Sequence, residues 1–185
     1  MTKPRSDTRQ RIQEAARGLF GRQGVQRTSL QDIADELGIT KPALYYHFAS
    51  REDLVRSILV PLIEEGERFV AEHEGRAAVD VRELVNGYFD FHYRHRRDLM
   101  LVLAESTMLA ELGLIDTVLA WRERLGRLVF GPEPTLAQSA RGVLAFGGLQ
   151  DCCIQFAEAP HDELRECSVQ AALDALGVSG RGRRR

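Results

Sequence analysis

Long apolar runs and cysteines are both scarce in this sequence. No apolar stretch approaches the roughly 18 residues that a membrane span needs, and residues 1–11 carry charges with no apolar stretch behind them, unlike a signal peptide. The three cysteines, Cys152, Cys153 and Cys167, are too few and too badly spaced for a disulfide framework or a zinc site. We therefore expect a reduced, cytoplasmic protein with no membrane segment.

The usual signals of catalysis are missing as well. The sequence has no nucleophile and base at a recognised spacing, no glycine-rich phosphate loop and no convincing set of metal ligands. His92 and His95, with Asp98 nearby, are compatible with a metal site or an anion site, but a solvated basic helix end is the simpler interpretation. We expect no metal and no cofactor.

Net charge is small, but it is unevenly distributed. The whole chain carries a formal charge of -2. Residues 1–52 hold nine Lys/Arg and six Asp/Glu, a net +3, whereas the remainder holds 16 and 21, a net −5. A basic N-terminal piece on an acidic body is a hint of polyanion binding at one end.

Helical periodicity fills most of the sequence, and no strand pattern of period two interrupts it. Apolar spacing and end signals predict helices over about 7–23, 28–37, 40–48, 50–74, 80–94, 97–112, 114–130, 135–158 and 162–176. This pattern predicts an all-α fold of about nine helices, with an N-terminal three-helix domain followed by a larger helical bundle. The tail after Gly177 is expected to be disordered.

Capping signals define several helix starts. A Ser, Thr or Asp followed three residues later by an acidic residue or glutamine predicts a capping box. The predicted pairs are Thr28–Gln31, Ser50–Asp53 and Asp80–Glu83. Thr40 is predicted to cap a further helix with Pro42 in its first turn, where the missing proline N–H costs nothing.

Two short helices joined only by residues 38–40 are typical of a helix-turn-helix, because the tight glycine turn forces a steep crossing. Leu44 and Phe48, four residues apart, are predicted to face inward against the first helix. Lys41 and the rings of Tyr45, Tyr46 and His47 cannot all point inward, so most of these side chains must lie on the outer face. A lysine and aromatic hydroxyls at an exposed helix suit phosphates and base edges. Packing of the two tyrosines between helices is the alternative.

The window "TSLQDIADELGITKPALYYHFASREDLV" resembles the DNA-binding signature of TetR-type transcriptional repressors. The matching features are a Leu-x-x-Ile-Ala helix, a Gly-Ile turn, the run Lys-Pro-Ala-Leu-Tyr-Tyr-His-Phe, and a Ser-Arg-Glu-Asp-Leu start to the next helix. The preceding "RQRIQEAARGLFGRQGVQRTS" resembles the family's first helix and turn. Arg51 stands where the family often has lysine.

The resemblance implies a homodimeric repressor that binds a double-stranded, palindromic DNA operator and is released by a small-molecule inducer. It divides the chain into a helix-turn-helix DNA-binding domain over 1–50, a ligand-binding and dimerisation domain over 51–177 and a basic tail over 178–185. DNA contacts are implied for Thr28, Ser29, Gln31, Thr40, Lys41, Ala43, Tyr45, Tyr46, His47 and Arg51. Of these, Tyr45, His47 and Arg51 would hold phosphates, and the residues at 40, 41, 43 and 46 would face the groove.

The body carries two further predicted surfaces. By resemblance, an inducer pocket is expected among Phe69, Tyr88, Phe89, His92, Met100, Leu103, Met108 and Trp121, with plain core packing as the alternative. Small and apolar residues of the last two helices predict a homodimer interface at Leu144, Gly148, Cys152, Leu164, Ala172 and Leu176, with an intrachain core as the alternative. Pro61 is expected to kink its helix near Ser57, and we hypothesise that ligand binding repacks helices against this kink.

A ligand-responsive repressor is the leading interpretation of the whole sequence. The main alternative is an all-helical small-molecule-binding protein or enzyme without a DNA role, and an activator also fits the same residues. Neither the ligand nor the operator sequence can be read from the chain.

Overall fold

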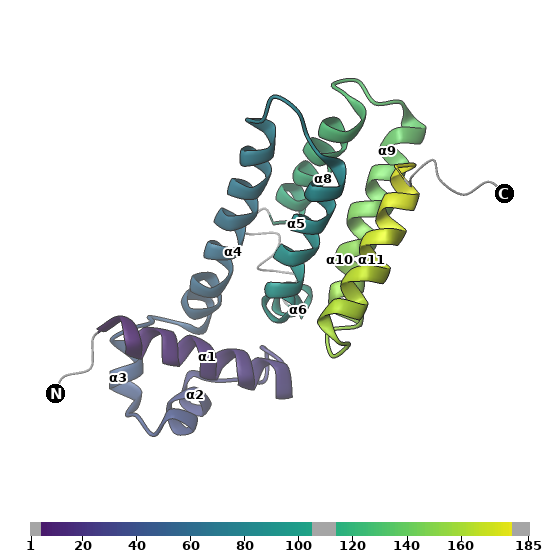
Figure 1. Cartoon of the computed structure of the whole chain (residues 1–185). Helices are drawn as coiled ribbons and strands as arrows, with labels where there is room; N and C mark the ends of the chain where they lie inside the picture. Colours follow the sequence, from purple (N-terminus) through teal and green to yellow (C-terminus); the bar gives the residue numbers. More distant parts are fainter. Residues whose placement is uncertain (1–4, 105–113, 179–185) are drawn as a thin grey trace. The chain divides into compact units, whose positions relative to one another are not determined.

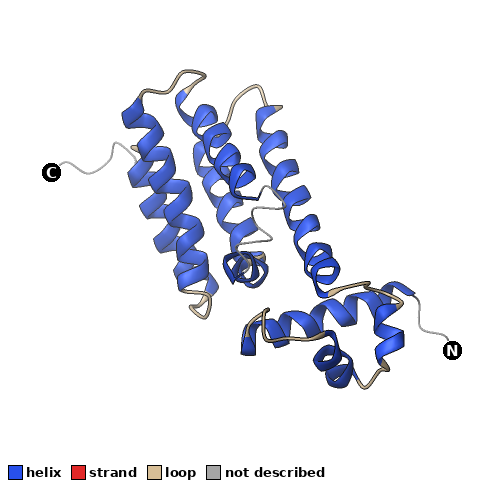
Figure 2. Ribbon diagram, turned by 180° about the vertical axis from the view of Figure 1, so that it is seen from behind, coloured by secondary structure: helices blue, strands red, loops and turns tan. Residues whose placement is uncertain are grey.

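The computed structural model of the protein describes residues 5–104 and 114–178, and its regular elements are helices (Figure 1). They are α1 (Arg5–Gln23), α2 (Leu30–Leu37), α3 (Lys41–Tyr45), α4 (Arg51–Glu74), α5 (Val81–Arg94), α6 (Arg96–Ala104), α8 (Leu114–Phe130), α9 (Leu136–Gly142), the π-helical turn η1 (Val143–Gly147), α10 (Gly148–Gln155) and α11 (His161–Leu176). With α9, η1 and α10 taken as one continuous helix, the described residues form nine helices and no strand (Figure 2). The predicted all-α fold is therefore confirmed.

The described residues form two compact units. Those of Met1–Glu64 and Arg97–Leu112 make the first unit, and those of Glu65–Arg96 and Gly113–Arg185 make the second. Helix α4 thus contributes its first part to one unit and its last part to the other. These units do not test the predicted functional boundary at residue 50, which stays a prediction. Within the described ranges, every helix is too short or too polar to cross a membrane.

The start of α2 differs from the prediction by one residue. Ser29 is the N-cap, because its hydroxyl accepts the Asp32 N–H at 3.1 Å while the Asp32 carboxylate accepts the Ser29 N–H at 2.8 Å. Thr28 is buried, and its hydroxyl donates to the Gly24 carbonyl at 2.8 Å. Thr28 therefore closes the loop after α1, and the predicted Thr28–Gln31 capping box was wrong.

Pro61 lies inside α4 and removes the N–H that would otherwise bond to the Ser57 carbonyl. Gln13 of α1 supplies the missing donor: its Nε2 donates to the Ser57 carbonyl at 3.2 Å and to the Ser57 hydroxyl at 2.9 Å. A glutamine from a neighbouring helix thus satisfies the carbonyl that the proline leaves open. The predicted kink and its role in signalling remain hypotheses.

Helix ends after α4 follow the prediction closely, with three differences. Asp80 caps α5 as predicted, but Glu83 bonds to Arg76 at 2.7 Å and leaves the capping box incomplete. The helix predicted over 97–112 is described as α6, and residues 105–112 lie outside the described residues. The helix predicted over 135–158 ends at Gln155 and contains the π-helical turn η1.

The last part of α4 packs against α8 around the tryptophan of the chain. The Trp121 indole lies directly over Gly66, so that an added Cβ at Gly66 would be 2.7 Å from Cζ3 of the ring. Its Nε1 donates to Glu67 at 2.9 Å. One turn along α8, Arg124 bonds to Glu67 at 2.8 Å and to Glu74 at 2.7 Å. These contacts fix α8 to α4 within the second unit.

Candidate nucleic-acid interface

The turn between α2 and α3 is built from local signals. Gly38 takes φ 63° and ψ 33°, a left-handed conformation that costs glycine little, and its N–H bonds back to carbonyls at the end of α2. Thr40 caps α3 as predicted, its hydroxyl accepting the Ala43 N–H at 3.4 Å, with Pro42 in the first turn. These contacts fix where α3 begins.

Helix α3 ends at Tyr45, three residues before its predicted end. The N–H groups of His47 and Phe48 both bond to the Leu44 carbonyl, at 2.9 Å and 3.0 Å, so the chain leaves the helix in a tight turn. Leu44 and Phe48 are fully buried. The predicted end was wrong, but the inward direction of these two side chains is confirmed.

The outer side of α3 carries residues that were predicted to read DNA. Lys41 and Ala43 are exposed, and the side chains of Tyr45 and Tyr46 are 46% and 65% exposed. Lys41 Nζ lies 5.8 Å from the centre of the Tyr45 ring, close enough for a cation–π contact. One short segment therefore presents an ammonium group and two phenols to solvent while its other side is buried.

Arg9 of α1 contacts the buried side of the segment that follows α3. Arg9 Nη1 donates to the His47 carbonyl at 3.0 Å, and its guanidinium carbon lies 4.3 Å from the centre of the Phe48 ring. His47 is half-buried, and its ring meets the Tyr46 ring edge-on with centres 5.3 Å apart. No local pattern in the sequence gives the Arg9 contact, because 38 residues separate the two partners.

Of the three residues predicted to contact DNA at the start of α2, two are exposed. Ser29 belongs to the capping box, whose hydrogen bonds to Asp32 lower the pKa of that carboxyl. Gln31 is exposed, and its Nε2 donates to Asp35 at 2.7 Å. Thr28 is buried and bonded within its own loop, so its side chain does not reach the surface.

Arg51 has contacts within the fold that the sequence did not predict. Its Nη1 donates to the carbonyls of Val25 and Gln26 at 3.3 Å and 3.2 Å, and its Nη2 lies 3.3 Å from Gln26 Oε1 and from Glu52. The guanidinium therefore ties the loop between α1 and α2 to the start of α4. Any phosphate held by Arg51 would compete with these bonds.

This arrangement falls within a stretch that matches a known family model. The model is described as "Bacterial regulatory proteins, tetR family", and it matches residues 12–58, from α1 through α2 and α3 into α4. This N-terminal stretch belongs to the TetR family. Because TetR proteins are regulators and not enzymes, the enzyme alternative is not retained.

Curated relatives match this chain mainly at its TetR-like N-terminal end. It is 39% identical over 74 residues to the HTH-type transcriptional regulator TtgR of Pseudomonas putida, a match that covers 40% of this chain and 35% of TtgR. It is 32% identical over 108 residues to the regulator YfiR of Bacillus subtilis, covering 56% of this chain and 50% of YfiR. The chain thus spans half or less of the length of these relatives. The crystal structure of Mycobacterium smegmatis AmtR matches with a TM-score of 0.76 and 21% identity, covering 96% of this chain and 90% of that one, which shows the shared fold.

The residues predicted to line a ligand pocket lie in different parts of the protein. Tyr88, Phe89, His92 and Trp121 are buried in the second unit, Phe69 is half-buried there, Met100 is exposed and belongs to the first unit, and the Leu103 side chain and Met108 lie outside what the structure describes. Neighbouring rings of α5 also have different partners. Tyr88 packs against His92 and Phe146, whereas Phe89 packs against Tyr93 and His161.

Tyr88 and His92 form a buried polar pair. Their ring centres are 4.1 Å apart, and His92 Nδ1 is 2.9 Å from the Tyr88 carbonyl. Because a carbonyl only accepts, Nδ1 carries the proton of the neutral ring. Burial lowers the pKa of His92 to about 4, and burial raises the pKa of Tyr88 to about 12 despite the opposing effect of Arg122. Both side chains are therefore uncharged at neutral pH.

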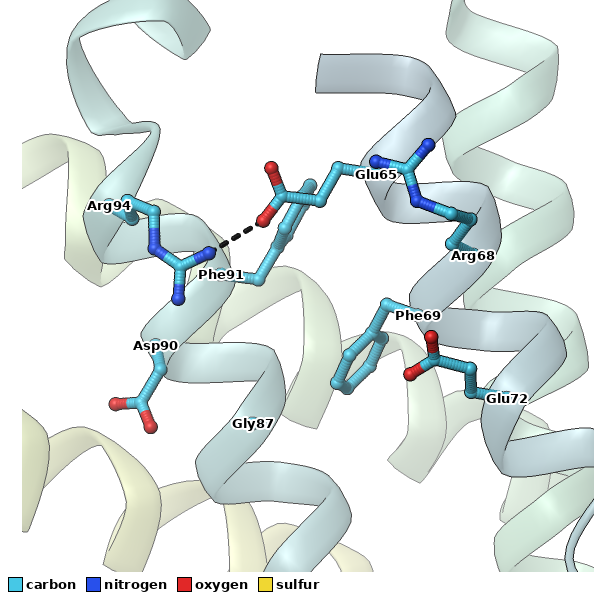
Figure 3. Close-up of a pocket in the computed structure, with 8 residues that line it drawn as sticks. All are labelled: Glu65, Arg68, Phe69, Glu72, Gly87, Asp90, Phe91 and Arg94. Atoms are coloured by element: carbon cyan, nitrogen blue, oxygen red, sulfur yellow. Dashed lines mark hydrogen bonds and ion pairs between the residues drawn. The ribbon is translucent and has the colours of Figure 1, made fainter. Parts of the chain in front are cut away.

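A hollow of about 370 Å³ lies on the second unit between α4 and α5 (Figure 3). It is lined by Glu65, Arg68, Phe69, Glu72, Gly87, Asp90, Phe91 and Arg94. Glu65 and Arg94 form an ion pair of 2.6 Å across it, as Figure 3 shows. The volume falls in the usual range for small-molecule sites, about 300–1,000 Å³. Phe69 is the residue of this hollow that was predicted to line a pocket.

The residues predicted to form a dimer interface divide by exposure. Leu144 is 69% exposed, Gly148 is exposed and Cys152 is half-buried, whereas Leu164, Ala172 and Leu176 are buried within the chain itself. A largely apolar hollow of about 450 Å³ lies between α10 and α11 and is lined by Cys152, Phe156, Ala159, Pro160, Glu163, Leu164, Cys167, Ser168 and Ala171. The exposed apolar residues here are those that a second copy could cover.

Proposed function

We propose that this TetR protein is a DNA-binding transcriptional regulator, a homodimeric repressor that a small-molecule ligand releases from a palindromic operator. The observation that carries the DNA role is the exposed segment from Lys41 to Tyr46, held on the buried side chains of Leu44 and Phe48 within the stretch that matches the family model. A rigid backing with an exposed polar face is what base readout requires.

The exposed residues have chemistry that fits distinct roles on DNA. Ala43 would touch a thymine methyl, Tyr46 would reach base edges or the sugar-phosphate backbone, and Lys41 would contact a backbone phosphate from the groove. Tyr45 and His47 would contact phosphates, which position a domain without specifying the sequence. Thr28 is left out of this proposal because it is buried, and Arg51 enters it as a residue that mainly holds the fold.

The exposed apolar face of the last helices supports self-association. Leu144 is 69% exposed and Phe156 is 53% exposed, and leaving such side chains in water is unfavourable when a partner can cover them. A two-fold dimer presents two identical reading segments, so its preferred operator is palindromic. The ligand would act by favouring one arrangement of the dimer over another, which requires different affinities for the two arrangements.

Fluorescence anisotropy with the DNA upstream of the protein's own gene tests the DNA role. The protein should bind with a strong salt dependence, and Lys41→Ala should weaken binding to all sequences and reduce the slope of log K against log salt by about one. Arg127→Ala is the matched control, because Arg127 is an exposed cation of α8 that pairs with Glu123. It should bind as the wild type does.

Two outcomes would contradict the proposal. Failure to bind any promoter-proximal fragment at low salt would refute the DNA role. A Lys41→Ala variant that keeps the full salt slope but prefers a different sequence would refute the phosphate contact of Lys41 while leaving DNA binding in place. Sedimentation of the wild type and of Leu144→Glu, which should be monomeric, tests the dimer separately.

A further inference from the structure

Among the described residues of the second unit, Arg122 of α8 is a cation without an acidic partner. Its Nη2 donates to Gln150 Oε1 at 3.0 Å. Its Nε is buried, and nothing among the described residues accepts a hydrogen bond from it. A buried donor without an acceptor is costly, so this nitrogen calls for an explanation.

The residues around Arg122 differ from those around its neighbours on the same helix. Arg124 pairs with Glu67 and Glu74, and Arg127 pairs with Glu123. In the part of the chain that the structure describes, no carboxylate lies within ion-pair distance of Arg122. It faces the neutral side chain of Gln150 and the Tyr88 hydroxyl, beside His92. A positive charge among neutral groups attracts an anion more strongly than a charge already paired.

The helix that contains η1 lies close to this guanidinium at Gly147. Gly147 closes the π-helical turn η1, and a Cβ added there would lie 3.3 Å from Arg122 Nη1 and 3.4 Å from its guanidinium carbon. A larger residue would press on the guanidinium. Turns of this kind interrupt α-helices frequently at functional sites. Gly147 and the extra residue of the turn together leave room for the arginine.

A chain of aromatic rings links this cluster to the hollow of Figure 3. Phe69 and Phe91 line that hollow. The Phe69 ring lies 6.3 Å from the Tyr88 ring, and the Phe91 ring lies 5.0 Å from the His92 ring, measured between centres. A ligand whose apolar body displaced these rings from the hollow would place its polar end near Arg122, Tyr88 and His92.

From these observations we infer that Arg122 binds the anionic group of the ligand, and that the ligand is a small carboxylate with an apolar body. The inference rests on the proposed response to a ligand. A guanidinium matches a carboxylate in geometry and charge, and the bond is stronger than one to a neutral amide. Nε is covered in the present arrangement, so the carboxylate binds an arrangement in which neighbouring side chains have moved. That requirement gives the ligand different affinities for two arrangements.

The single tryptophan of the chain, Trp121, is adjacent to Arg122 and serves as a fluorescent reporter. Octanoate and benzoate are titrated into the full-length protein, with octanamide and benzamide as neutral counterparts of the same shape. At least one carboxylate should bind the wild type about tenfold or more tightly than its amide. Arg122→Met should remove that preference. Arg127→Met, which loses the same charge elsewhere on α8, should keep it.

Circular dichroism establishes that each variant folds. Arg122→Lys keeps the charge but loses the planar fork, so it should bind the carboxylate about tenfold less tightly, and it replaces Arg122→Met if that variant does not fold. No carboxylate preference in the wild type, or a preference that survives in Arg122→Met, would overturn the inference. DNA release is measured separately. If carboxylate binding depends on Arg122 but does not release the protein from DNA, only the proposed ligand response is refuted. If only the amides release the protein from DNA, only the role of Arg122 is refuted.

Discussion

Replacing Gly66 by alanine tests the contact that fixes α8 to α4. In the middle of a helix, glycine to alanine usually gains about 1 kcal/mol. Here the new Cβ would lie 2.7 Å from Cζ3 and 2.9 Å from Cζ2 of Trp121, so the ring must move. Overpacking costs about 1–3 kcal/mol, and displacing the indole breaks its bond to the Glu67 carboxylate, worth about 1 kcal/mol or more. The losses exceed the gain, and we expect Gly66→Ala to lower the free energy of unfolding by about 2 kcal/mol.

Urea unfolding followed by tryptophan fluorescence measures this change directly. The native emission of Trp121 should also shift, because the indole leaves its position against α4. Gly126→Ala in α8 is the matched control, since nothing lies within 4 Å of the Cβ it would add; it should raise stability by up to about 1 kcal/mol. If Gly66→Ala were as stable as Gly126→Ala and had unchanged emission, the proposed packing of Trp121 would be refuted.

Three further predictions concern other residues. Gln13→Leu leaves the Ser57 carbonyl without a donor and should lower stability by about 1 kcal/mol in urea unfolding; an unchanged midpoint would contradict the contact. The pKa of His92 is about 4 when folded and 6.5 when exposed, so its stabilising contribution is present above pH 6.5 and is lost as pH falls; between pH 7 and pH 5 the loss should be about 2 kcal/mol and should be absent in His92→Gln. Burial raises the pKa of the Cys153 thiol to about 12, whereas Cys167 is exposed; Ellman's reagent should therefore label Cys167 in the folded protein and Cys153 only after unfolding, and rapid labelling of a variant with both Cys152→Ser and Cys167→Ser, which retains only Cys153, would contradict this.

The N-terminal helices could be predicted well because their signals are local. Helical spacing placed Leu44 and Phe48 inside, and Gly38 and Thr40 marked the turn and the next start. The capping box of α2 was misplaced because two adjacent hydroxyl residues are both good caps. Only the bond from Thr28 to the loop after α1 decides between them.

The contacts of the body could not be predicted, because they join residues far apart in the sequence. Periodicity indicates that Tyr88 and His92 are apolar-face residues of α5, but it does not show that Arg122 and Gln150 meet them from other helices. Long-range bonds also decide how a charged side chain is used. Arg51 was assigned to phosphate by resemblance, and its bonds to backbone carbonyls became visible only in the fold.

The π-helical turn η1 determines how its helix would respond to the deletion of one residue. Such a turn holds one residue more than the α-helix around it, and each α-helical residue advances the side chains by about 100°. Deleting one residue within Val143–Gly147 would restore a regular helix and leave the later residues facing as they do now, because the turn takes up its extra residue within itself. Converting the turn to α-helix with no residue removed would instead rotate everything after it by about 100° relative to α9. Gln150 would then point away from Arg122, and Phe156 would leave the exposed face. A protein of full length and unchanged helical content would lose both surfaces at once, whereas one residue shorter it would keep them.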